Sequence, residues 1–310
     1  MSTEHTYQGH SDTIFALDWS PDGRFLASGG RDGTVRLWDV RSGTCVRILH
    51  ADHTHCVLSL AWSPDGTYLA VGTTNGAVHV WASTSGKLVT TYRGHVRFVR
   101  GLSWSSDGVY LASGGDYGDS TVQVWEALSA RHCATYSDQY RVFAVRWLKD
   151  GTRGARVASC SFDGQVLVRH FGSDEQPYTT MHEHIGPVYA LAYHPAGQPT
   201  THDPGSTEYL ASAGQDATVR VWEPESGRAL CTYCGHSQAI KTLACSPDGL
   251  HVASAGDDQV VHVWSLVTGQ PVALYRGHRA WVRSVAWSPT GASIASVDDS
   301  LVHVWQFERI

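Results

Sequence analysis

Hydrophobic and polar positions alternate along the chain in short runs that are separated by turn-forming residues. In the first unit the alternating runs span residues 14–20, 25–29, 34–39 and 45–49. The segments between them are Pro-Asp-Gly at 21–23, Arg-Asp-Gly at 31–33 and Arg-Ser-Gly at 41–43. A period of two residues is typical of β-strands, and Pro, Asp and Gly favour tight turns. The pattern therefore predicts four short strands, and no part of the chain shows helical periodicity.

This four-stranded unit recurs along the chain. Trp-Ser-Pro-Asp-Gly stands at 19–23 and 62–66, and looser copies stand at 104–108, 147–151, 193–197, 245–249 and 287–291. A second marker is a Trp that ends an alternating run, at Trp38, Trp81, Trp125, Trp222, Trp264 and Trp305. The long interval between Trp125 and Trp222 contains a degenerate unit in which Arg169 replaces the Trp. Four strands in a unit of roughly 42 residues make one propeller blade.

We therefore predict an all-β fold: one seven-bladed β-propeller over residues 1–310, with four antiparallel strands in each blade. The predicted blades span about 9–51, 52–93, 94–137, 138–181, 182–234, 235–276, and 277–310 together with 1–8. The last unit has only three strands, whereas Tyr7 precedes His10 just as Tyr92 precedes His95. Residues 1–8 are thus expected to supply the outer strand of the seventh blade and to close the ring without an unpaired interior edge.

A third marker is a His at the start of each unit. It stands at His10, His53, His95, His184, His236 and His278, and Asp138 takes its place in the fourth unit. Together, Gly-His, Trp-Ser-Pro-Asp-Gly, Ser-x-x-x-Asp-Gly and Trp-Asp resemble the WD-repeat family closely, over essentially the whole chain. The resemblance implies that His10, Ser28, Asp32 and Trp38, and their counterparts, form a buried hydrogen-bonded tetrad. A hydrolase triad is the alternative, but a catalytic constellation is needed once and this one recurs.

Two units depart from this tetrad. The second has Val71 and Asn75 in place of Ser and Asp, and the fourth has Asp138 and Arg169 in place of His and Trp. We expect Asp138 and Arg169 to form a substitute charge contact. These two blades are expected to be the least stable parts of the ring.

Composition narrows the functional classes. The net charge of −6 argues against a general binder of nucleic acid or anionic membranes. Cys231 and Cys234 have the CxxC spacing of a redox or metal pair, but the strand predicted there would point them to opposite faces. The seven cysteines are odd in number, which favours free thiols in a reducing compartment over a disulfide framework. The start of the chain lacks a signal peptide, and no apolar run is long enough to span a membrane. We therefore expect a cytoplasmic monomer with no membrane partner.

Catalytic motifs are missing from the sequence. It contains no Gly-rich phosphate loop, no GxSxG and no HExxH, so we expect no catalytic residues and no cofactor. Two groups of metal-ligating residue types occur, namely His50, His53 and His55, and His194, His202 and Asp203. Solvated or hydrogen-bonded histidines are the commoner interpretation, so no metal site is expected.

The resemblance also implies where a partner would bind. The top face consists of the loops that enter each inner strand and the loops between the second and third strands of a blade. Its exposed positions lie three and five residues after the repeat His, and immediately before the tetrad Asp. We predict these partner-binding residues: Phe15, Arg31, Phe98, Arg100, Arg141, Phe143, Phe162, Tyr189, Lys241, Trp281 and Arg283. Only Asp257 and Asp298 oppose the basic residues, giving this face a charge of about +3.

Aromatic and Arg residues are the usual hot spots of interfaces, although some of these rings could instead pack between blades. The expected function is a non-catalytic protein-interaction scaffold for an acidic and apolar peptide or protein, such as a phosphorylated peptide. One alternative is an enzyme or a receptor for a small molecule or metal in the central channel. Another is a nucleic-acid binder on the basic face. The insertions at 116–119 and 195–209 are either further contact sites or disordered loops.

Overall fold

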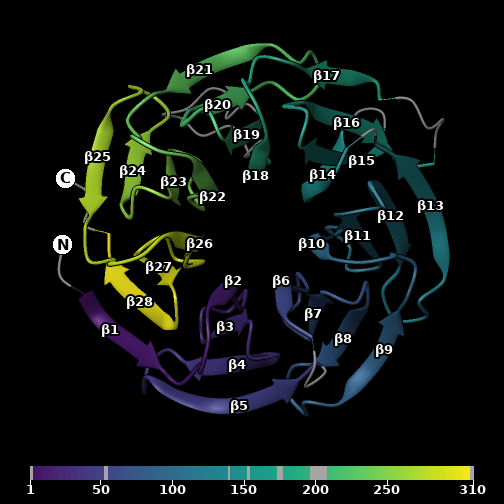
Figure 1. The fold of residues 1–310 in the computed structure, drawn as a ribbon, viewed down its shortest axis with the longest axis vertical. Coiled ribbons are helices and arrows are strands. Elements are labelled where there is room, and N and C mark those ends of the chain that lie inside the picture. Colours follow the sequence, from purple (N-terminus) through teal and green to yellow (C-terminus); the bar gives the residue numbers. More distant parts are fainter. Residues whose placement is uncertain are drawn as a thin grey trace.

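The computed structural model of the chain describes residues 3–51, 55–138, 140–151, 154–172, 177–195 and 208–307. The regular elements of this part are 28 β-strands, which form seven antiparallel sheets of four strands each. Down its shortest axis the molecule is a ring of sheets around an open centre (Figure 1). The prediction of an all-β, seven-bladed propeller is confirmed.

Each blade takes its strands in order from the channel to the rim. Blade one contains β2 (Ile14–Trp19), β3 (Phe25–Gly30), β4 (Thr34–Asp39) and β5 (Thr44–His50). Blade two contains β6 (Val57–Trp62), β7 (Tyr68–Thr73), β8 (Val78–Ala82) and β9 (Leu88–Tyr92). Blade three contains β10 (Val99–Trp104), β11 (Tyr110–Gly115), β12 (Thr121–Glu126) and β13 (His132–Ser137). Blade four contains β14 (Val142–Gly151), β15 (Gly154–Ser161), β16 (Val166–His170) and β17 (Thr179–Met181).

The remaining blades follow the same order. Blade five contains β18 (Val188–His194), β19 (Tyr209–Gly214), β20 (Val219–Trp222) and β21 (Ala229–Tyr233). Blade six contains β22 (Ile240–Cys245), β23 (His251–Gly256), β24 (Val261–Ser265) and β25 (Pro271–Tyr275). Blade seven contains β26 (Val282–Trp287), β27 (Ser293–Asp298), β28 (Leu301–Gln306) and, from the start of the chain, β1 (Thr3–Gln8).

Burial explains why the blades need one another. The second strands are buried almost throughout, whereas the outer strand β5 alternates between exposed and partly buried residues. The hydrophobic clusters cross blade boundaries: one that contains Ile14 and Leu26 of blade one also contains Val297 and Val302 of blade seven. A single four-stranded sheet cannot bury both of its faces, so each blade depends on its neighbours for a core.

The start of the chain closes the ring, as predicted. Strand β1 pairs antiparallel with β28 (Figure 1). In this pairing Tyr7 lies opposite Val302. Tyr7 is only 2% exposed, and its ring stacks on Trp38 of blade one with 5.4 Å between centroids. The closing strand therefore pairs with one blade and packs against the next.

The same joint recurs between other blades. An outer-strand Tyr stacks almost parallel on the tetrad Trp of the following blade, in the pairs Tyr92–Trp125, Tyr233–Trp264 and Tyr275–Trp305. The Tyr hydroxyl also reaches the residue two positions before that Trp. Tyr275 Oη lies 3.0 Å from His303 Nδ1, for example. Stacking and hydrogen bonding together set how adjacent blades meet.

The buried tetrads are confirmed in full in blades one, three and five; in blade six His236 bonds to Ser254 and Asp258, but Trp264 Nε1 has no partner among the described residues. In blade one, His10 Nε2 lies 2.7 Å from Ser28 Oγ, His10 Nδ1 lies 2.9 Å from Asp32, and Trp38 Nε1 donates to Ser28 Oγ at 2.8 Å. The same contacts occur in blade three around Ser113 and in blade five around Ser212. The Ser and His atoms that a hydrolase would use are bonded within the blade. His53 of blade two lies outside the described residues.

In blade seven the predicted position of the tetrad Asp was wrong. Placing Asp298 on the top face made Asp299 the tetrad residue, but Asp298 is only 6% exposed and lies 3.3 Å from His278 Nδ1. The reason is a one-residue deletion between Ser296 and Trp305, which shortens the turn and moves the carboxylate position by one.

Blade four uses an ion pair in place of the missing tetrad members, as predicted. Arg169 donates to Asp138 and, at 3.1 Å, to Ser159 Oγ. Ser159 Oγ donates in turn to the Asp138 carboxylate at 3.2 Å. Asp138 and Arg169 are both buried, so their charges depend on each other for compensation.

Acid should weaken the ring, because burial lowers the pKa of His10, of His278 and, to about 4, of His262. These side chains protonate near 6.5 when unfolded, so their stability contribution is present above that pH and is lost as the pH falls below it. At pH 5 the shifted pKa of His262 alone should lower the free energy of unfolding by at most about 2 kcal/mol. Burial raises the pKa of Asp18, to about 6, and that of Asp138, and both of these shifts act in the opposite sense. Melting temperatures at pH 8, 6.5 and 5 test this; an unchanged or higher value at pH 5 contradicts it.

Candidate partner-binding face

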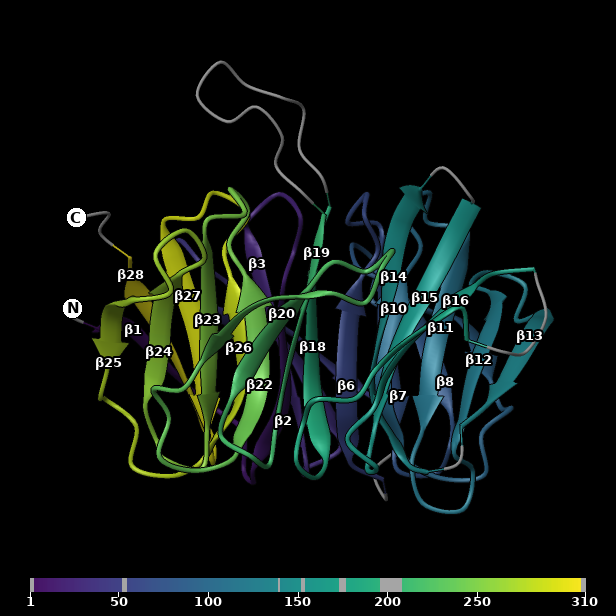
Figure 2. The ribbon, with the colours of Figure 1, turned by 90° about the horizontal axis from the view of Figure 1, so that it is seen from above.

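The predicted face lies at one end of the propeller, where the chain enters each inner strand. In side view the strands run between two opposite faces, on which the loops gather (Figure 2). The seven residues that stand five positions after the repeat His, or after Asp138, all line a central cavity of about 800 Å³. We call them the mouth ring: Phe15, Leu58, Arg100, Phe143, Tyr189, Lys241 and Arg283. Each blade contributes one residue to it.

A β-bulge in every blade explains this arrangement. The register between the first and second strands shifts at the mouth-ring residue: Ile14 pairs with Gly30 and Ala16 with Gly29, so Phe15 is left unpaired. The same shift occurs in the other six inner strands. A bulge releases one residue from the alternation of the strand and redirects its side chain. The mouth ring is therefore built by backbone geometry that recurs independently of the side chain present.

On one side of the mouth, aromatic and cationic side chains form a continuous band. The Arg141 guanidinium lies 4.0 Å from the centre of the Tyr117 ring and 5.6 Å from that of Phe162. Phe143 contacts both Phe162 and Tyr189, with ring centroids 6.5 and 5.1 Å apart. Lys241 Nζ lies 3.8 Å from the Tyr189 ring centre. We call these six residues the aromatic arc: Tyr117, Arg141, Phe143, Phe162, Tyr189 and Lys241.

A smaller group lies at the junction of blades seven and one. The Arg283 guanidinium lies 5.2 Å from the Trp281 ring centre and 5.8 Å from that of Phe15. Trp281 is 49% exposed, and in the described residues Arg283 has no carboxylate within ion-pair distance. These three residues, the Arg283 cluster, thus present a large exposed ring and an uncompensated cation side by side.

The face is less positive than predicted. Asp116 lies 2.5 Å from Arg100 Nε and 3.7 Å from Arg141 Nε, while Lys241 lies 3.4 Å from Asp257. Arg31 is 3.8 Å from Asp12. Two of these acids, Asp116 and Asp12, were not counted in the prediction, and Asp298, which was counted, is buried in its tetrad. Arg283 is the predicted cation on this face that keeps no acidic neighbour among the described residues.

The structure does not bring all the predicted residues together. Phe98 is partly buried immediately before β10, and among the described residues no ring contact joins it to the arc. Arg31 lies in the loop between β3 and β4, away from the arc, and faces Asp12 of the loop that precedes β2. Phe143 packs against the hydrophobic core between blades four and five, so the alternative of interblade packing applies to this ring.

The 116–119 insertion, which the sequence left open as a further contact site, contributes Tyr117 to the arc and Asp116 beside it, although neither was among the predicted partner-binding residues. Tyr117 is 52% exposed and has a positive φ of 21°, and Asp116 accepts the hydrogen bond from Arg100. Both lie in the 116–119 insertion, so the extra loop length was the available signal. Ile185, 80% exposed immediately after His184, was also missed.

Metal-ligating side chains gather in two blades. The candidate ligand atoms of His236, Asp258 and His262 lie within 4.8 Å of one another, and those of His278, Asp298 and His303 do so as well. Tetrad hydrogen bonds already engage His236 and His278. Of the groups considered from the sequence, His53, His202 and Asp203 lie outside the described residues. Cys231 and Cys234 are both free, as are the other five cysteines.

None of the described elements is a helix of the length and apolarity needed to cross a bilayer.

Comparison with known proteins identifies the repeats. The family described as "WD domain, G-beta repeat" matches residues 1–39, 43–82, 86–126, 175–223, 227–265 and 269–306. The gap at 127–174 contains Asp138 and Arg169, the residues that replace the tetrad His and Trp.

Three curated relatives match most of the chain. It is 28% identical over 280 residues to nuclear distribution protein PAC1-2 of Uncinocarpus reesii. The aligned region covers 81% of this chain and 58% of that protein. It is 29% identical over 301 residues to F-box-like/WD repeat-containing protein TBL1X of Mus musculus, with 78% and 55% covered. It is 28% identical over 300 residues to WD40 repeat-containing protein HOS15 of Arabidopsis thaliana, with 79% and 48% covered. The chain therefore spans about half the length of these relatives.

Proposed function

Because the chain belongs to the WD40 (WD domain, G-beta repeat) family, we propose that it is a non-catalytic platform that binds a peptide or protein partner on its top face. Members of this family are generally protein-interaction scaffolds. The observation that carries the proposal is the pair of exposed aromatic and cationic groups, the aromatic arc and the Arg283 cluster, on one rim of the channel. Such side chains supply most of the energy of known interfaces.

The chemistry of this face supports a partner with acidic and apolar groups. Cations held on aromatic rings offer a flat apolar surface and a positive charge together. Arg283 has no acidic neighbour among the described residues, and the two cations nearest Asp116 share one carboxylate. An acidic or phosphorylated side chain beside an aromatic or aliphatic one would complement both properties.

The recurrence of the tetrad supports the non-catalytic part of the proposal. Its Ser and His atoms bond to each other in buried positions, so the tetrad serine is not available as a nucleophile. The free cysteines support a reducing compartment such as the cytoplasm as the place where the chain works.

Substitution of three exposed face residues tests the proposal. The F162A/W281A/R283A variant should keep the melting temperature of the wild type but lose about 2 kcal/mol of binding energy, roughly 30-fold in Kd. The probe is a pool of fluorescent peptides that place glutamate or phosphoserine beside leucine or tyrosine, and a matched pool carries lysine at the acidic positions.

A variant on the opposite face is the control. Arg41 and Val267 are exposed in turns between the third and fourth strands, and R41A/V267A should bind the acidic pool like the wild type. Equal binding of both peptide pools, or full-strength binding by the triple variant, would show that the partner does not use this face in the proposed way.

A further inference from the structure

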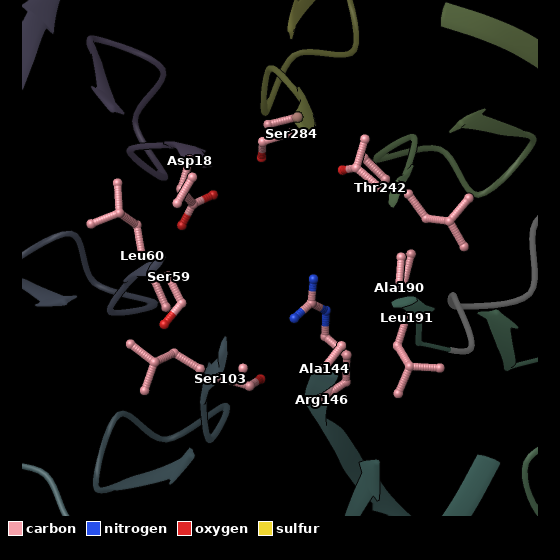
Figure 3. A pocket seen from close by; sticks show the side chains of 18 of the residues that line it. Asp18, Ser59, Leu60, Ser103, Ala144, Arg146, Ala190, Leu191, Thr242 and Ser284 are labelled. Carbon is pink, nitrogen blue, oxygen red and sulfur yellow. The ribbon is translucent and has the colours of Figure 1, made fainter. Parts of the chain in front are cut away.

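Arg146 occupies the wall of the channel below the mouth ring. It follows Phe143 by three residues on β14, which places it about 10 Å deeper at roughly 3.3 Å per residue. Figure 3 shows its guanidinium pointing into the open centre of the cavity. Arg146 is partly buried, and its side chain lines the cavity.

The positions level with Arg146 leave space around it. They are small or acidic in the other six blades: Asp18, Ala61, Ser103, Ala192, Ala244 and Ala286. No second long side chain competes for the channel at this level, and Figure 3 shows the labelled Ser59, Ser103, Thr242 and Ser284 around the same opening. The cavity therefore has room for a ligand beside the guanidinium.

The guanidinium has little compensation from the protein. Within the described part of the chain it makes one hydrogen bond, from Nη1 to the carbonyl of Val145 at 2.9 Å, although it carries five N–H donors. Asp18 is the one acid among the described lining residues, and its carboxylate accepts hydrogen bonds from the backbone N–H groups of Trp19 and Trp62. No ion pair within 4 Å joins Arg146 to a described residue. Burial lowers the pKa of Arg146, and the charge of Asp18 offsets only part of this effect.

We propose that the channel is an anion-binding site in which Arg146 binds a carboxylate or phosphate group that enters through the mouth ring. Arg100, Lys241 and Arg283 line the same cavity, so an anion that approaches from the top face meets positive charge along the way. The hydroxyl groups on the wall can add hydrogen bonds to its oxygens. Arg146 lies deeper in the cavity than the aromatic rings that carry the proposed partner contact, and anion binding there does not require that contact.

Titration of the full chain with inorganic tripolyphosphate tests the site. The wild type should bind one equivalent in isothermal titration calorimetry, and R146Q should bind at least about tenfold more weakly, as expected for loss of a charge-assisted contact. The exposed R41Q on the outer turn is the matched control and should bind like the wild type. D18N should bind severalfold more tightly, because it removes the one negative charge of the described lining.

Absence of binding to the wild type, or equal binding by wild type and R146Q at equal melting temperature, overturns the proposal. The source of the anion is a separate question. If an acidic side chain of a partner supplies it, R146Q weakens the acidic peptides and tripolyphosphate competes with them; if a free anion supplies it, the peptides bind unchanged. Both outcomes retain the anion site. Failure of the peptides to bind at all leaves the tripolyphosphate result unaffected, so the two proposals fail independently.

Discussion

Deletion of residues 1–8 is expected to lower the melting temperature of the whole chain by about 10 °C or more. The deletion removes β1 from blade seven and exposes the backbone edge of β28. It also removes Tyr7, which is buried against Trp38. Loss of one buried aromatic side chain and several ladder hydrogen bonds amounts to roughly 6 kcal/mol. Each kcal/mol corresponds to about 1.5 °C in a chain of 310 residues, so the shift is on the order of 10 °C.

Two point variants within β1 separate the causes. Y7A keeps the strand but loses the stacked ring, so it should lower the melting temperature by less than the deletion. Q8A alters an exposed residue of the same strand and should have no effect. A truncated chain that melts at the wild-type temperature would show that the pairing of β1 with β28 does not hold the ring together.

The second large loss of stability is expected when one partner is removed from the buried Asp138–Arg169 pair of blade four. D138A should destabilise the chain by about 3–5 kcal/mol, because it leaves the buried Arg169 guanidinium without its carboxylate. The midpoint of urea denaturation should fall accordingly. Ser159 and the adjacent Tyr136 ring, which Arg169 also contacts, cannot compensate a full charge.

A double variant provides the control. Ser159 and Asp163 already stand at the tetrad positions of this blade, so D138H/R169W supplies the two missing members. A neutral hydrogen-bonded network in place of a buried ion pair should recover most of the loss, or exceed the wild type. If D138A unfolds at the same urea concentration as the wild type, the pair is not a structural substitute for the tetrad.

The fold was predictable because the information is repeated. Each blade carries the same turn residues and the same tetrad, and degenerate positions such as Arg169 could be located from the intact copies on either side. The closing strand was predictable for the same reason, since Tyr7 occupies the position of Tyr92 and Tyr275. Repetition failed where the length of a repeat changed. The shorter turn of blade seven led to the wrong tetrad Asp, and the longer loop of blade three hid Tyr117 and Asp116.

The candidate site was less predictable because the spacing of residues along the chain does not show which side chains of neighbouring blades touch. The positions of Arg141, Tyr189 and Lys241 followed from the repeat, but their stacking depends on the angle between blades. The ion pairs of Asp116 required the path of an inserted loop. Arg146 was overlooked because its position in the other blades holds Ala, Ser or Asp, and only the closed ring turns a strand residue into a channel residue.

Because of the bulge at the start of each inner strand, the side chain that faces a partner is not one that the strand needs for its hydrogen-bonded pairing. A residue that forms no ladder pair can be exchanged with little effect on the sheets around it, except where, like Phe143, it also packs against a core cluster. Phe, Leu, Arg, Tyr and Lys already occupy this position in one molecule, on backbones of the same shape. Since each blade contributes one such residue to the same opening, substitutions in single blades can change which ligand the face binds while the propeller itself is unchanged.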